Sequence, residues 1–175
     1  ARLVYLGVAH TLADDDSSRL VIDIGGGSTE FVIGQRFEPK LRESLHMGCI
    51  SYSNRFFPGG KITKKYFEKA YQMAYQEVLN IRKPYKKHGW ENAVGSSGTM
   101  RAVEQVICAQ GWSSEGISAS GLQNLRKLLL ESKHMDELPE LEGLSERRRH
   151  VIVPGVAIIC GIFDALKLEH MGTSS

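Results

Sequence analysis

The chain has 175 residues, a formal net charge of +2 and 42% hydrophobic residues, which is the composition of a globular protein with its own core. Because the basic residues are spread along the chain, the charge gives no case for nucleic-acid binding. No apolar run reaches the roughly 20 residues that a membrane-spanning helix needs.

The chain begins with a pattern that is typical of a helix interior. Residues 1–6 carry no capping residue ahead of them, so we expect the chain to be a fragment of a longer protein. The three cysteines, Cys49, Cys108 and Cys160, are widely spaced among apolar residues. This usage indicates reduced thiols and a cytoplasmic protein rather than a disulfide framework.

A glycine-rich run from Asp23 to Glu30 is the most informative stretch of the chain. Apolar residues 20–22 precede it and residues 31–33 follow it, which predicts two buried strands joined by a tight turn. Glycine amides can converge on an anion, and the hydroxyls of Ser28 and Thr29 can donate to phosphoryl oxygens. The candidate phosphate-binding residues of this loop are Gly25, Gly26, Gly27 and Ser28.

Two carboxylates bracket this loop and suggest its chemistry. Asp23 is too acidic to lie beside a phosphate unaided, which argues for a divalent cation or its water shell between them. Glu30 could then orient or deprotonate a water molecule. A plain hairpin with polar capping residues is the alternative interpretation. Three glycines followed by Ser-Thr and bracketed by two acids favour phosphate chemistry.

A third strand and a long helix are predicted next. Residues 40–46 are expected to extend the hairpin, and Pro58-Gly59-Gly60 breaks the chain before Thr63 caps a helix. Apolar residues at helical spacing through Leu79 give that helix one buried face. Pro84 is expected to kink or end it.

A second glycine-rich run lies between a predicted strand at 90–94 and an apolar helix through Ile107. Amides in such a loop lie at a helix N-terminus, where partial positive charge favours an anion. A plain connector is the alternative, and the presence of the first loop favours phosphate. The candidate phosphate-binding residues here are Gly95, Ser97, Gly98 and Thr99.

The remaining pattern is helical. Ser118 is expected to cap a leucine-rich helix, and residues 151–168 form a core helix with Pro154 in its first turn. Strands first, followed by alternating strand and helix, predict an α/β domain with a mixed sheet.

Basic residues occur in three local groups, which are either solvated helix faces or a path for a polyanion. These groups are Lys61, Lys64 and Lys65; Arg82, Lys83, Lys86 and Lys87; and Arg147, Arg148 and Arg149.

Two glycine loops of this kind resemble the phosphate loops of the actin, sugar kinase and chaperone ATPase superfamily. Within it, the chain is most similar to the exopolyphosphatase and guanosine pentaphosphate phosphatase family, over nearly its whole length. The runs that carry the resemblance are residues 1–3, 23–30, 47–49, 57–60, 95–99, 143–145 and 153–155.

The resemblance implies a ribonuclease H-like (actin-like ATPase) domain, the second half of a two-domain catalytic core. It implies magnesium held through Asp23, Glu30 as a supporting catalytic residue, and phosphate on both glycine loops. The expected substrate is inorganic polyphosphate, with guanosine pentaphosphate as the alternative. A binding module without hydrolysis is a third possibility. The resemblance also implies a cytoplasmic homodimer.

Departures from the family pattern lie at both ends. The family's catalytic glutamate belongs immediately before Ala1, so we expect the chain alone to bind phosphate weakly and to turn over little or no substrate. We place the phosphatase half-domain at residues 1–169 and expect residues 170–175 to be a tail outside it.

Overall fold

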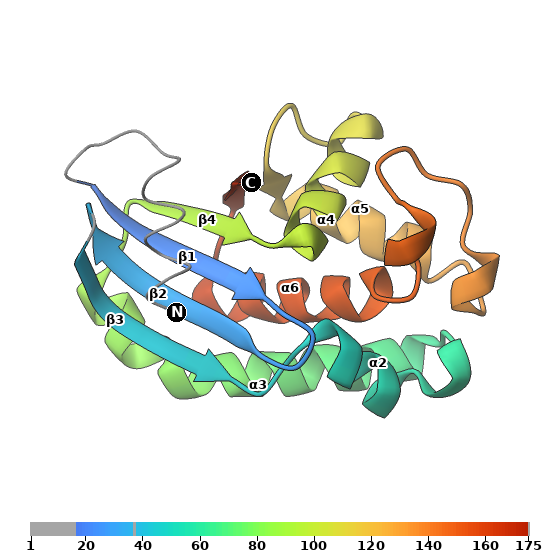
Figure 1. Ribbon diagram of the computed structural model, residues 1–175, viewed down its shortest axis with the longest axis horizontal. Coiled ribbons are helices and arrows are strands. Elements are labelled where there is room, and N and C mark those ends of the chain that lie inside the picture. Colours follow the sequence, from blue (N-terminus) through green and yellow to red (C-terminus); the bar gives the residue numbers. More distant parts are fainter. Residues whose placement is uncertain (1–16, 37, 175) are drawn as a thin grey trace.

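The computed structural model describes residues 17–36 and 38–174. Its centre is a six-stranded sheet with the order β3-β2-β1-β4-β6-β5 (Figure 1). The central strands β1, β4 and β6 are parallel, and the other strands are antiparallel to their neighbours. The strands are β1 (Ser18–Ile24), β2 (Thr29–Gln35), β3 (Glu38–Leu45), β4 (Asn92–Ser96), β5 (Ile117–Ser118) and β6 (His170–Ser174).

Five α-helices accompany the sheet in the described part of the chain. Helices α3 and α6 run side by side beneath the sheet in Figure 1, and α6 also contacts α2, α4 and α5. Every residue of α6 except Asp164 is buried, so the predicted core helix is confirmed. The helices are α2 (Cys49–Phe56), α3 (Lys64–His88), α4 (Gly98–Ala109), α5 (Ala119–Leu129) and α6 (Ile152–Leu166).

The predicted hairpin around the first glycine loop is confirmed. Strands β1 and β2 pair antiparallel over their full lengths, and β3 adds the predicted third strand. Side chains of alternate residues, such as Leu20 and Ile22 in β1, point into the core. Tyr85 of α3 donates from its hydroxyl to the Phe31 carbonyl at 2.8 Å, which ties the helix to the sheet.

Helix α3 begins as predicted but does not end where we expected. The Thr63 hydroxyl accepts from the Tyr66 amide at 2.9 Å. Pro84 lies inside the helix, which continues to His88, so the prediction that it ends the helix is wrong. The helix ends instead at Gly89, whose φ of +75° suits glycine. Packing of Ile81 and Tyr85 in the core keeps the last turn helical around the proline.

Strand β4 begins two residues later than residues 90–94 predicted and runs into the second glycine loop. Its last residue, Ser96, pairs with Asp23 of β1 and with Ser174 of β6. Hydrogen-bond partners on both sides therefore extend the strand into a sequence of low strand propensity.

The expected tail is part of the sheet. Residues His170–Ser174 form β6, which lies between β4 and β5, and Met171 is completely buried. The prediction of a tail outside the folded domain is therefore corrected for residues 170–174. The segment has no apolar alternation that would indicate a strand. It forms one because strands far away in the sequence supply its backbone partners.

Two other predictions are confirmed, and one lies outside the described residues. Ser118 caps α5 by accepting from the Gly121 amide at 3.0 Å. Cys49, Cys108 and Cys160 are free thiols. The described residues contain no helix that is both long and apolar enough to span a membrane. The helix expected at residues 1–6 lies outside the described part.

Candidate functional site

Asp23 and Glu30 lie directly opposite each other in β1 and β2, one pair before the pair nearest the turn, Ile24 and Thr29. Burial raises the pKa of Asp23, and the Glu30 carboxylate raises it further. The Ser28 hydroxyl donates to Oε1 of Glu30 at 2.8 Å, which fixes that side chain. Among the described residues, no basic side chain forms an ion pair with Asp23 or Glu30. The negative charge of this pair is therefore not offset by an ion pair there.

The first turn of α2 binds carbonyl groups of the loop that lies between Asp23 and Glu30. The Cys49 amide donates to the Gly25 carbonyl at 3.0 Å, and the Ile50 amide donates to the Gly26 carbonyl at 2.9 Å. The Thr29 hydroxyl donates to the Met47 carbonyl at 2.6 Å. A helix N-terminus thus fixes the loop instead of binding an anion directly.

This arrangement leaves three loop amides for a ligand. The amide of Gly25 donates to the Ser28 carbonyl at 2.8 Å and is not available. The amides of Gly26, Gly27 and Ser28 have no hydrogen-bond partner among the described residues. They are the donors that this loop can offer to an anion.

Gly48 allows α2 to approach the loop. A Cβ atom at this position would lie 2.3 Å from the carbonyl carbon of Gly26 and 2.4 Å from the Gly27 nitrogen. Only glycine fits there. Gly48 was not among the predicted site residues, although the Met-Gly-Cys run that contains it was noted in the resemblance.

The second loop ends beside the first because β4 is parallel to β1. Ser97 is the N-cap of α4, with a φ of +133° that non-glycine residues rarely adopt, and its hydroxyl accepts from the Met100 amide at 3.2 Å. The first-turn amides of Gly98 and Thr99 therefore remain as donors at the helix N-terminus. Gly95 is a buried strand residue, where packing against Met100 accounts for the glycine.

Two arginines complete the site. The Arg148 guanidinium fills the space beside Gly98, where a Cβ would lie 1.8 Å from one of its nitrogens. It also donates to the Thr99 hydroxyl at 3.4 Å. Arg147 lines the same cavity, whereas Arg149 is buried and donates to the carbonyl groups of Leu138 and Pro139.

A cavity of about 310 Å³ joins the two loops. Gly25 and Gly26 from the first loop, Thr99 from the second, and Arg147 and Arg148 all line it. The lining is completed by Ile24, Cys49, Ile50 and Val151.

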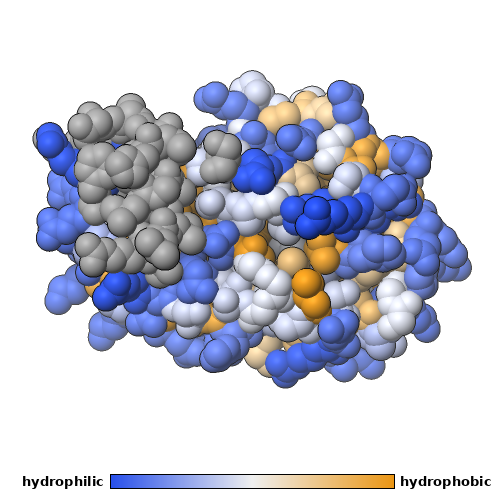
Figure 2. All heavy atoms as spheres, viewed as in Figure 1, coloured by the Kyte–Doolittle hydropathy of each residue, from blue (hydrophilic) through white to orange (hydrophobic). Residues whose placement is uncertain are grey.

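Ile50 is the one large hydrophobic side chain that is exposed in the described residues, at 56%. Near the centre of the face in Figure 2, a small apolar area adjoins strongly hydrophilic surface, where β1, α2 and α4 meet in Figure 1. Backbone amides and guanidinium groups around one cavity can hold a phosphorylated anion.

The carboxylates of this site could hold magnesium only if a bound ligand or water completes the coordination of the ion. The described residues contain no group of three or more side chains that could hold a metal ion. Magnesium, however, is commonly bound through one or two carboxylates together with substrate phosphates and water. Asp23 and Glu30 supply carboxylates of that kind.

The model of the Ppx/GppA phosphatase family matches residues 1–175. A Haemophilus influenzae protein named as a candidate exopolyphosphatase is 41% identical over 171 residues, which cover 98% of this chain and 52% of that protein. A guanosine-5'-triphosphate,3'-diphosphate pyrophosphatase of Vibrio vulnificus is 40% identical over 171 residues, which cover 98% of this chain and 34% of that protein. The chain thus spans about half of the length of the first relative and about a third of the second.

The Aquifex aeolicus Ppx/GppA structure superposes with a TM-score of 0.83, at 20% identity. The match covers 99% of this chain and 57% of that structure. The predicted actin-like ATPase fold with a mixed sheet and flanking helices is confirmed.

Proposed function

This chain belongs to the Ppx/GppA phosphatase family, and from that premise we propose that it is part of an exopolyphosphatase. The full protein would hydrolyse the terminal phosphate of inorganic polyphosphate. The observation that carries the proposal is the cavity in which Gly25, Gly26, Thr99 and two arginines meet. A terminal phosphoryl group bears its charge on oxygens that amides and guanidinium groups bind well.

Asp23 would hold magnesium, with Glu30 beside it. The pKa of Asp23 is raised first by burial and then by the Glu30 carboxylate, and a divalent cation bound at this pair would offset the repulsion between the two carboxylates. When bound, magnesium would supply charge neutralisation on the transferred phosphoryl group.

Glu30 would support the attack by helping to orient the water. Its carboxylate is fixed by the Ser28 hydroxyl at 2.8 Å, which leaves Oε2 for the water. The amides of Gly26, Gly27 and Ser28 would bind the oxygens of the phosphoryl group under attack. Those of Gly98 and Thr99, with Arg148, would stabilise the charge that develops on the leaving phosphate chain.

Guanosine pentaphosphate is the second candidate substrate. The 40% identity with the Vibrio vulnificus pyrophosphatase favours it, and both substrates end in a phosphoanhydride. A module that binds such anions without hydrolysis is the remaining candidate.

We further propose that the full protein is a cytoplasmic homodimer. Light scattering of the full-length protein tests the dimer by its mass.

The test is phosphate release by the full-length protein, with polyphosphate and guanosine pentaphosphate supplied side by side, with and without magnesium. Faster magnesium-dependent release from polyphosphate is expected. Faster release from the nucleotide would install the second candidate, and binding of either anion without release would leave a binding module. Arg148→Gln should weaken activity, while Lys87→Gln, on an exposed helix position, serves as its charge-matched control.

A further inference from the structure

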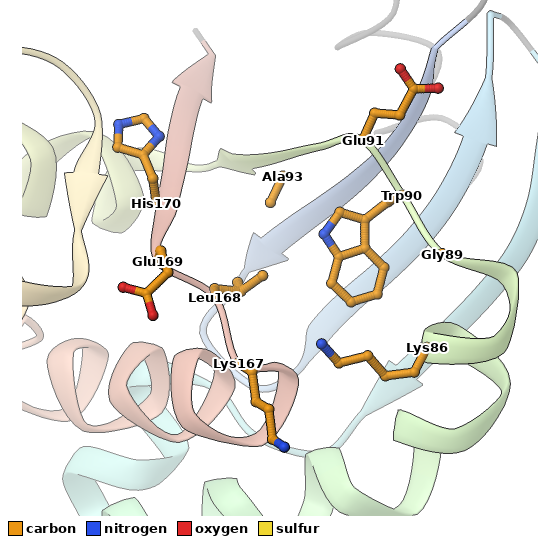
Figure 3. Close-up of a pocket in the computed structure, with 9 residues that line it drawn as sticks. All are labelled: Lys86, Gly89, Trp90, Glu91, Ala93, Lys167, Leu168, Glu169 and His170. Atoms are coloured by element: carbon orange, nitrogen blue, oxygen red, sulfur yellow. The ribbon is translucent and has the colours of Figure 1, made fainter.

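A second pocket lies at the opposite end of the parallel strands from the cavity between the glycine loops. It has a volume of about 390 Å³ and lies where the C-terminal ends of α3 and α6 approach the start of β4. Figure 3 shows Trp90, Leu168 and Ala93 near its middle, with Lys86 below the indole and Lys167 beneath Leu168. Apolar side chains and two ammonium groups therefore share one opening.

Lys86 is held in place without an ion pair. Its ammonium nitrogen lies 5.1 Å from the centroid of the Trp90 ring, within the range of a cation–π contact. Neither Lys86 nor Lys167 forms an ion pair within residues 17–36 and 38–174. Figure 3 shows the carboxylates of Glu91 and Glu169 pointing away from Lys86.

The two lysines add to each other's positive field. Burial lowers the pKa of Lys86, and the positive charges of Lys167 and Arg82 lower it further. Arg82 donates to the Ala165 carbonyl at 3.4 Å, so it contacts the end of α6. The ammonium groups of Lys86 and Lys167 thus lie beside the pocket without an ion pair in the described residues, and Glu91 and Glu169 line the same pocket.

Lys167 stands at a position that favours glycine. Its φ is +57°, in the left-handed conformation that ends α6, and the Leu168 amide donates to the Phe163 carbonyl at 2.8 Å. A lysine there carries a conformational cost that glycine would avoid. Compared with glycine, a lysine at this helix end therefore adds a positive charge.

We propose that Lys86, Lys167 and Trp90 form a second anion site, which binds a small phosphate ester. Lysine binds phosphate as a point charge, whereas a carboxylate is matched best by the fork of an arginine. Arg82 is not among the residues that line this pocket, whose ammonium groups are those of Lys86 and Lys167. The wall of Trp90, Leu168 and Ala93 would contact the carbon part of the ligand. The site is separate from the proposed hydrolytic cavity and does not depend on it.

Lysine footprinting of the full-length protein tests this site with phenyl phosphate as the probe. The protein is acetylated briefly without magnesium, and the modification of each lysine is quantified by mass spectrometry. Phenyl phosphate should slow acetylation of Lys86 and Lys167 several-fold and leave Lys83 and Lys87, exposed on the same helix, unchanged. Inorganic phosphate should protect only at higher concentration, because it lacks the ring that contacts Trp90.

Equal acetylation of Lys86 and Lys167 with and without the probe would overturn the site. Equal slowing of all four lysines would also overturn it, because that is bulk charge screening.

Two variants complete the test. Lys167→Gly removes one charge at a backbone conformation that glycine prefers, so the fold is retained, and protection of Lys86 should require several-fold more probe. Unchanged protection would contradict the role of Lys167. In Arg148→Gln the protection should persist; its loss would show that the lysines report on the first cavity and would refute a second site. Either result is independent of whether the protein hydrolyses polyphosphate.

Discussion

At the residue scale, the geometry of the site depends on Gly48, because a residue with a side chain would not fit there. Gly48 lets the first turn of α2 bond to the carbonyl groups of Gly25 and Gly26, which turns the remaining loop amides toward a ligand. A methyl group at Gly48 would push the helix and the loop apart, because the contacting atoms belong to the backbone and cannot rotate away.

Gly48→Ala should therefore lower the kcat/KM of phosphate release by the full-length protein by about 100-fold, the effect of a misplacement near 1 Å. Gly172→Ala is the matched control, since a Cβ there meets nothing nearer than 4.0 Å. Steady-state kinetics of both variants make the measurement. Equal activities would show that α2 does not set the loop geometry.

The charge on Asp23 should also oppose folding. Its pKa is raised in the folded protein, so the folded state holds this proton more strongly than the unfolded chain does. The contribution to the free energy of unfolding is then lost as the pH rises from the ordinary pKa of Asp through the raised one. Asp23→Asn avoids that loss.

Asp23→Asn should raise the melting temperature at neutral pH and lower kcat by at least ~100-fold. Its advantage in stability over the parent should shrink as the pH falls through the same window. Magnesium should stabilise the parent protein and not the variant. Thermal melts across pH, with and without magnesium, check all three; a variant less stable than the parent at neutral pH would contradict the assignment.

At the element scale, three consecutive arginines have different roles; Arg147 and Arg148 end the 3₁₀ helix Glu146–Arg148, and Arg149 follows it as the C-cap. Arg148 reaches the Thr99 hydroxyl and Arg147 lines the cavity. Arg149 does not line the cavity and donates to the carbonyl groups of Asp136, Leu138 and Pro139. A turn of this tightness distributes successive side chains in different directions.

Arg148→Gln should raise KM with little change in stability, because its side chain contacts the cavity. Arg149→Gln should instead lower the free energy of unfolding by about 2 kcal/mol, since the carbonyl group of the buried Leu138 loses its donor. Denaturant melts and kinetics of both variants separate the two roles. Similar behaviour of the two variants in both measurements would contradict this division.

At the scale of the whole molecule, the sheet closes through its last strand. β6 supplies the partner for both β4 and β5 and buries Met171 against Gly95. The second glycine loop is therefore supported by residues more than 70 positions further along the chain.

Deleting residues 170–175 from the 175-residue chain should abolish cooperative unfolding, because β4 would lose one neighbour and the core one wall. Met171→Ala should cost about 2–5 kcal/mol and keep the fold. Circular dichroism during thermal unfolding measures both. A truncated chain that melts like the parent would show that β6 is dispensable.

The sequence by itself determined the features that depend on near neighbours in the chain. The apolar runs on either side of residues 25–28 specified the hairpin, and Thr63 and Ser118 specified two helix starts. The candidate residues Gly25, Gly26 and Thr99 do line one cavity. Local hydrogen bonds and side-chain periodicity decide such features within a few residues.

Only the tertiary structure determined which residues far apart in the sequence contact one another. Arg148 meets Thr99 across 49 residues, Gly48 meets the first loop, and β6 enters the sheet without a strand-like sequence. None of these carries a local signal, because each depends on backbone or charge supplied by another element. The sequence could therefore predict the two glycine loops and place Arg148 in a basic group, while the contact of Arg148 with Thr99 and the need for glycine at position 48 required the packed fold.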